Sequence, residues 1–243
     1  MNILTELLFP RRCPVCDDVI RMRLGKKKQK SGEWNKICPE CVTKLVPVEE
    51  PWCLKCGKPL KKDEQEYCHD CSRRNHVFTA GRAVFTYDSA AASLYRFKYG
   101  GRQEYAECYG ALAARLLSED KRLKTAQAIV PVPLHPARQR KRGYNQAALF
   151  ARALGTAWSI PVREDLVVRC KNTDPLKQLN PIQRQNNLKK AFKMMQNDVK
   201  LNTIIIVDDI YTTGSTMDAV ARVFSDAGVH KIYFVTLAAG NGI

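Results

Sequence analysis

The sequence predicts an α/β fold with a mainly parallel sheet, preceded by a cysteine-rich module. Two observations predict it. Eight of the ten cysteines form C-x-x-C pairs, and the last pair ends at Cys71. Beyond residue 76, wholly apolar segments alternate with segments of helical periodicity, which is the pattern of parallel strands covered by helices. We therefore expect a small module over residues 1–76 and a larger α/β domain over residues 77–243.

The spacing of the cysteine pairs indicates metal binding in the module. Two cysteines separated by two residues place both sulfurs on one side of a tight turn, which suits a tetrahedral metal. In a reducing compartment this metal is zinc, and redox pairs or disulfides are the alternative. Consecutive grouping into two zinc sites is the simplest arrangement, and a cross-braced arrangement is the other. The candidate ligands are Cys13, Cys16, Cys38, Cys41, Cys53, Cys56, Cys68 and Cys71.

The elements of the larger domain follow from local patterns. Strands are predicted at 81–87, 128–132, 203–207 and 231–237, and those at 128–132 and 203–207 are predicted to be buried. Apolar residues at intervals of three and four predict helices at 90–98, 103–117, 145–154 and 216–227. Gly228 is a typical stop for the last of these helices. Parallel strands bind ligands at their carboxyl ends, so we expect the functional site there.

The stretch from Thr203 to Met217 carries the most specific site signal. An apolar strand leads directly to Asp208 and Asp209, whose carboxylates can accept hydrogen bonds from vicinal ribose hydroxyls. Gly214 permits a tight turn, and the start of the next helix favours a phosphate group. The alternative interpretation is an ordinary strand-to-helix turn with Ser215 or Thr216 as the helix cap. The hydroxyl donors of the loop are Thr212, Thr213, Ser215 and Thr216.

Basic residues are concentrated in two parts of the chain. Between residues 135 and 195 there are thirteen Lys and Arg residues and only three acidic residues. In this part Arg138 and Arg142 follow a strand end, and the forked guanidinium suits phosphate, although a solvated face is the alternative. The second run lies between the first two cysteine pairs, at the tip of a zinc ribbon, where it can contact a nucleic-acid backbone. Its candidate DNA contacts are Lys26, Lys27, Lys28 and Lys30.

Two tryptophans of the module have two interpretations. Trp34 and Trp52 flank the cysteine pairs, and each indole could either stack on nucleic-acid bases or cover the small metal-held core.

Several motifs together resemble one known family. The stretch from Val207 to Thr216 resembles the binding signature for phosphoribosyl pyrophosphate (PRPP) of type I phosphoribosyltransferases. Nearly the whole chain resembles the ComF family, that of the competence protein ComFC and its relatives, with a double zinc ribbon ahead of a phosphoribosyltransferase domain. A departure is Leu176, where family members often have Gln. The further motifs of this resemblance are Leu7–Cys16, Phe97–Gly101, Val130–Arg138, Arg142–Gln146 and the spacing of Leu179, Arg184 and Asn187.

The resemblance implies a type I phosphoribosyltransferase fold and a role in DNA uptake during natural transformation. It implies single-stranded DNA as a partner, a helicase-type ATPase of the competence machinery as another, and PRPP with Mg²⁺ at residues 208–216. It also places a pyrophosphate loop near Arg138 and Arg142 and a mobile loop at about 169–185. An active enzyme that transfers phosphoribose from PRPP to a nitrogen acceptor is the alternative.

The sequence favours a cytoplasmic protein. No apolar run approaches the ~18 residues needed to span a bilayer. The N-terminus has an early Glu6, and its arginines come after the apolar part, which is the wrong order for a secretory signal. We expect no transmembrane segment, and contact with the inner face of the membrane would come through partners.

Overall fold

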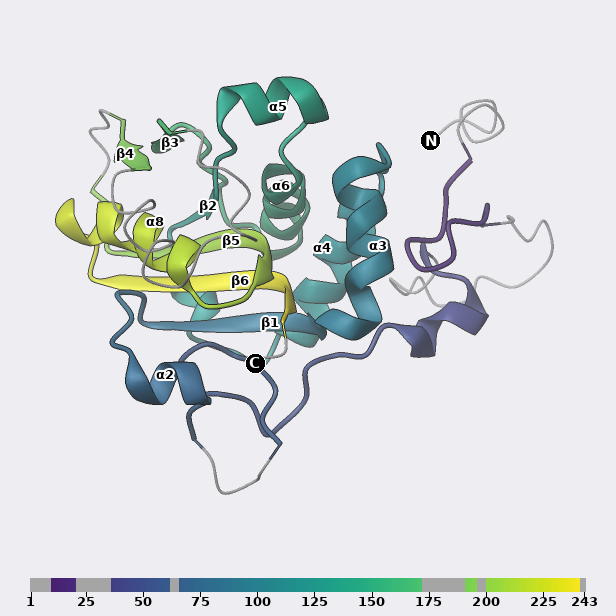
Figure 1. Cartoon of the computed structure of the whole chain (residues 1–243), viewed down its shortest axis with the longest axis horizontal. Coiled ribbons are helices and arrows are strands. Elements are labelled where there is room, and N and C mark those ends of the chain that lie inside the picture. The colour runs from purple at the N-terminus through teal and green to yellow at the C-terminus, as the bar shows by residue number, and fades with distance from the viewer. Residues whose placement is uncertain (1–9, 21–35, 62–65, 172–190, 196–199, 241–243) are drawn as a thin grey trace.

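The computed structural model describes residues 10–20, 36–61, 66–171, 191–195 and 200–240 (Figure 1). The candidate DNA contacts Lys26, Lys27, Lys28 and Lys30 lie outside these residues, as do Trp34 and Leu176.

A four-stranded parallel sheet forms the centre of the domain, which confirms the predicted fold class (Figure 1). The strand order is β1-β6-β5-β2. The four strands are β1 (Ala80–Thr86), β2 (Ala128–Pro131), β5 (Thr203–Tyr211) and β6 (Lys231–Ala239). Each predicted strand is present, and most of its residues are buried, as expected for parallel strands that are covered on both faces.

Helices cover both faces of this sheet. Alternate residues of β5 point to opposite sides, so Ile205 and Val207 pack in one core while Ile204 and Ile206 pack in the other. The first core contains residues of α3, α4 and α6, and the second contains residues of α8. These helices are α3 (Tyr87–Tyr99), α4 (Tyr105–Leu116), α6 (Gln146–Trp158) and α8 (Ser215–Asp226).

The structure extends two predicted strands and adds elements that were not predicted. Strand β5 runs on past Val207 to Tyr211, because its last residues still pair with β6. Its other neighbour β2 ends with Pro131 opposite Val207, so the end of β5 has one open side. Asp208 and Asp209 therefore lie within the strand, beyond the end of β2. The elements that were not predicted are α5 (Pro136–Arg142), the antiparallel pair β3 (Val167–Arg169) and β4 (Phe192–Met194), and the short η2 (Pro39–Lys44), α2 (His69–Arg73) and η3 (Leu123–Thr125).

The cysteine-rich segment packs against the α/β domain at two places. Cys13 and Cys41 belong to the core that contains α3, α4 and α6. Cys53 and Cys56 belong to the core that contains α8. Between them, residues 46–48 run beside β1, where the Val48 amide donates to the Val84 carbonyl. The segment thus shares the apolar cores of the domain and is not held by its thiols alone.

Candidate functional site

The two carboxylates of β5 differ in their surroundings. Asp209 is buried and accepts from Lys98 Nζ at 2.5 Å and from Gln146 Nε2 at 3.3 Å. Asp208 has its pKa raised to about 6 by burial, and nearby positive charges, that of Lys98 first, oppose this rise. The half-buried carboxylate of Asp208, held among cations, is electrostatically poised for a polar ligand.

Two helix ends bring the partners of Asp209 to it. Lys98 lies in the last turn of α3, and Gln146 is the first residue of α6. Helix α6 starts there because Asn145 accepts from the Ala147 amide as the N-cap, while its Nδ2 donates to the Val132 carbonyl after β2. The cap therefore fixes the start of α6 at the carboxyl edge of the sheet, next to Asp209.

A tight loop follows the carboxylates. Gly214 adopts φ 78°, and a Cβ at this position would lie 2.6 Å from Tyr211 Oη and 2.9 Å from His76 Cε1. Only glycine fits both the left-handed backbone and this space. Gly214 is the N-cap of α8 and no side chain caps the helix, so the interpretation of Ser215 or Thr216 as an ordinary cap is wrong. The first amides of α8 can then donate to an anion.

The hydroxyls of the loop gather at the start of α8. Thr213 Oγ1 and Ser215 Oγ are 3.0 Å apart, and Thr212 is exposed. Thr216 is half-buried in the first turn of the helix. The predicted hydroxyl-rich loop is therefore assembled beside the two carboxylates.

Three arginines lie near Asp208 or near one another. The Arg142 guanidinium donates to Gln146 Oε1, so Gln146 bridges Arg142 and Asp209. Arg169, at the end of β3, has its pKa lowered first by burial and then by the positive charge of Arg138. The negative charge of Asp208 acts on Arg169 in the other direction. Like charges held this close to one another favour an anion between them.

Sequence reasoning gave no role to three of these residues. Lys98, Gln146 and Arg169 come from three separate elements, and only the fold brings them to the carboxylates. Lys98 and Gln146 do stand in the family motifs Phe97–Gly101 and Arg142–Gln146, and that position is the signal that could have found them.

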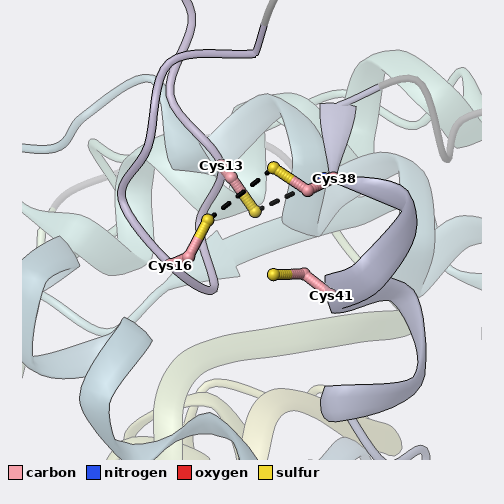
Figure 2. A group of neighbouring side chains, drawn as sticks. All are labelled: Cys13, Cys16, Cys38 and Cys41. Carbon is pink, nitrogen blue, oxygen red and sulfur yellow. Dashed lines mark hydrogen bonds between the residues drawn. The ribbon is translucent and has the colours of Figure 1, made fainter.

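The eight paired cysteines form two separate groups of four. Within each group the Sγ atoms all lie within 4.8 Å of one another, and the grouping is the consecutive one. Figure 2 shows the sulfurs of the first group pointing toward a common centre. Cys16 and Cys38 have their Sγ atoms 3.7 Å apart, close to the ~3.8 Å expected between two ligands of a tetrahedral zinc with Zn–S bonds of about 2.3 Å. The ligands of the first group are Cys13, Cys16, Cys38 and Cys41, and those of the second are Cys53, Cys56, Cys68 and Cys71.

The chemistry of the second group also fits a metal. Side-chain hydrogen bonds lower the pKa of Cys53, and the hydrogen bond with Cys53 raises the pKa of Cys56 far above its ordinary value. Four thiols this close cannot all ionise unless a cation lies among them. These residues fit Zn²⁺, which would join each group by four thiolate bonds.

Comparison with known proteins agrees with both parts of the structure. A model described as "Double zinc ribbon domain" matches residues 4–72, and one described as "Phosphoribosyl transferase domain" matches residues 140–242. "Competence protein F" of Haemophilus influenzae is 30% identical over 210 residues, which cover 84% of this chain and 90% of the relative. The chain belongs to the ComF family.

Two further relatives extend the comparison across this family. "Competence protein ComFC" of Bacillus subtilis is 29% identical over 211 residues, 79% of each chain. "DNA utilization protein YhgH" of Escherichia coli is 28% identical over 230 residues, 93% of this chain and 96% of the relative. The double zinc ribbon and the phosphoribosyltransferase domain are thus the two parts of this ComF family member.

The second cysteine group of this ComF family member lies against the hydroxyl-rich loop between β5 and α8. Lys58, within this part of the ribbon, pairs with Asp70 at 3.0 Å and lies 5.6 Å from the ring centroid of Tyr211. His76 Nδ1 is 2.7 Å from a carboxylate oxygen of Asp218 in α8. Burial raises the pKa of Tyr211, and the nearby Cys56 raises it further. The ribbon therefore forms the wall behind the loop that begins at Tyr211.

Two other features bear on the sequence predictions. The guanidinium of Arg82 lies 3.6 Å from the ring centroid of half-buried Trp52, which favours the interpretation that Trp52 covers the core. In the part of the chain that the structure describes, none of the helices has the length and apolar character to cross a membrane.

Proposed function

We propose that this chain acts in DNA uptake during natural transformation and that it binds single-stranded DNA under the influence of a phosphosugar ligand. The names of the relatives point to competence and to the use of DNA. The formal net charge of +16 supports a polyanionic partner. A cytoplasmic location, with a helicase-type ATPase as a protein partner, belongs to the same proposal.

The ligand that we propose is PRPP, bound at residues 208–216. The observation that carries this proposal is the meeting of carboxylates, cations and a hydroxyl-rich loop at the open end of β5. The loop and the first turn of α8 would hold the 5′-phosphate. Asp208 and Asp209 would accept hydrogen bonds from the ribose hydroxyls, and Arg138 and Arg142 would face the pyrophosphate.

Magnesium is proposed to enter together with this ligand. The carboxylate of Asp208 is the oxygen ligand that such an ion prefers. The charges of Lys98, Arg142 and Arg169 act on the same carboxylate and disfavour a bare cation there. A magnesium ion that enters bound to the pyrophosphate would have its charge offset by the phosphate oxygens. The ion would also help to neutralise the pyrophosphate as the leaving group.

An active phosphoribosyltransferase is the second candidate, favoured by the group of Arg138, Arg142 and Arg169 near Asp208. In that reaction the bond from C1′ of the ribose to pyrophosphate breaks, a nitrogen of the acceptor bonds to C1′, and the nitrogen releases a proton. The arginines would neutralise the departing pyrophosphate while the carboxylates hold the ribose, and such positioning supplies most of the catalysis.

One set of measurements separates these candidates. We would compare the wild type with Asp209→Asn, and use Asp165→Asn as the matched control because its carboxylate pairs with Arg163 away from the site. We expect Asp209→Asn to weaken Mg²⁺-PRPP binding in calorimetry and to leave the anisotropy of labelled single-stranded DNA unchanged when PRPP is absent. Pyrophosphate release that depends on a nitrogen acceptor would favour the enzyme.

Two outcomes would contradict the proposal. Wild-type protein that binds no Mg²⁺-PRPP would refute the ligand. Wild-type protein that binds no single-stranded DNA at modest salt would refute the uptake role. Charge reversal of Lys26, Lys27 and Lys28 tests the predicted ribbon-tip contact, which should lower both the DNA affinity and its salt dependence.

A further inference from the structure

Helix α3 presents a pair of exposed tyrosines to solvent. Tyr95 and Tyr99 lie one helical turn apart, and they are 66% and 64% exposed. Their ring centroids are 5.1 Å apart with the ring planes at 51°. The opposite side of the helix is buried through Leu94 and Phe97, so the fold itself does not need the tyrosine rings. Two large rings that are kept in water side by side mark an interaction surface.

Positive charge adjoins the two rings. The Arg142 guanidinium lies 5.0 Å from the ring centroid of Tyr99, which brings helix α5 next to the end of α3. Helix α5 carries Arg138, Arg140, Lys141 and Arg142 and no acid, and Arg140 and Lys141 are exposed. Figure 1 shows α5 over the amino-terminal end of α6, on the same side of the molecule as one end of α3. The acid within α3, Asp88, lies in its first turn, away from the tyrosines.

This combination matches single-stranded DNA. Unpaired bases stack on aromatic rings regardless of their sequence, and the cations follow the phosphates. In a duplex the bases stack on one another, so exposed rings add nothing to duplex binding. The surface therefore offers aromatic rings for the bases of a single strand and positive charges for its phosphates.

The tyrosine pair is connected to the carboxylate site by two short paths. Lys98 pairs with Asp209 and is next to Tyr99 in the chain. Arg142 lies by Tyr99 and bonds to Gln146, whose amide donates to Asp209. A ligand that draws Arg142 toward its phosphates would change the charge beside Tyr99.

We infer that Tyr95 and Tyr99 form a base-stacking platform for single-stranded DNA, with Arg140 and Lys141 along its phosphates and Arg142 shared with the phosphosugar site. This inference rests on the proposed function and adds where the strand lies. The predicted ribbon-tip lysines would be a separate contact, because the platform lies on α3 and α5.

The test is fluorescence anisotropy with a labelled oligothymidylate and an abasic strand of the same length. Each stacked base contributes about 1–3 kcal/mol, so the loss of both rings in Tyr95→Ala/Tyr99→Ala should weaken oligothymidylate binding about 25- to 20,000-fold. The salt slope should stay the same because no phosphate contact is lost. The ring-keeping Tyr95→Phe/Tyr99→Phe and the distant Tyr67→Ala are the controls, and both should bind as the wild type does.

Two further measurements keep the test independent of any single variant. Wild-type protein should bind the abasic strand more weakly than oligothymidylate, and the alanine double variant should bind both alike. Arg140→Gln/Lys141→Gln should reduce the salt slope by about 1.4, at about 0.7 for each phosphate contact on a single strand.

The outcomes separate this inference from the proposed function. Equal wild-type affinity for the thymidylate and abasic strands, or an alanine double variant that is folded and binds normally, overturns the platform and leaves the uptake role standing. Preference for duplex over single strand overturns the platform as well. Failure of the wild type to bind either strand refutes the proposed function, and the platform with it.

Discussion

Replacing Gly214 with alanine should be costly for two separate reasons. The first is the backbone, because φ is 78° at this position and the left-handed region costs an L-residue about 1–2 kcal/mol. The second is space, because the new Cβ would lie 2.6 Å from Tyr211 Oη and 2.9 Å from His76 Cε1. Both neighbours are held by packing, so the clash should add about 1–3 kcal/mol. We expect the free energy of unfolding to fall by about 2–5 kcal/mol in Gly214→Ala.

Gly228 provides a matched control for this measurement. It has φ 89°, and a Cβ built there meets nothing within 4 Å, so Gly228→Ala should show the backbone cost alone. Urea unfolding of the wild type and both variants, with zinc present throughout, would give the difference that belongs to the clash. Calorimetry should also show that Mg²⁺-PRPP binding is lost in Gly214→Ala and kept in Gly228→Ala. If the two variants lose the same stability, the tight packing behind the loop is refuted.

Three further predictions concern charge and metal. Because the pKa of Asp208 is raised to about 6 from 3.8, the folded state holds its proton more tightly, and stability should fall by about 2–3 kcal/mol as pH rises from below 4 to above 6. Asp17 and Asp120 have lowered pKa values and change stability in the opposite direction. Urea unfolding across that range should therefore show this loss as the difference between the wild type and Asp208→Asn, and equal profiles would contradict it. Lys98→Met leaves the buried carboxylate of Asp209 without its cation and should lower the free energy of unfolding by about 3–5 kcal/mol. The further loss should be smaller when Asp209→Asn is already present, and additive losses in this double-mutant cycle would argue against the ion pair. Metal analysis should give two zinc equivalents in the wild type and one in Cys53→Ser, and fewer than two in wild-type protein purified under reducing conditions would count against two ribbon sites.

The parts of the fold that local patterns specify could be predicted from the sequence. The apolar run before Asp208 is long enough to be a buried strand, and the periodicity of the helices is regular. The end of β5 could not be predicted, since pairing with β6 extends it past the apolar run to Tyr211. Strand β6 likewise pairs on to Ala239, two residues beyond its predicted end. Helix α5 was missed because it has no buried residue, so the apolar period that identifies a helix is absent.

The candidate site was predictable only where its residues are contiguous. Asp208, Asp209 and the loop to Thr216 stand together in one motif. Lys98 is more than a hundred positions away from Asp209, and its 2.5 Å contact depends on where α3 ends against the sheet. Ion pairs of this kind are set by tertiary packing, which no local pattern records.

The contact between the second cysteine group and the loop changes how the chain can be divided. A fragment that began after His76 would lack the imidazole that meets Asp218 and the lysine that lies over Tyr211. Its loop would then face water where the ribbon now stands. Excision of the ribbon is therefore not a neutral dissection, and the activity of such a fragment would describe a different molecule. Because the zinc ribbon and the loop contact each other directly, a substitution in either one would change the surroundings of the other.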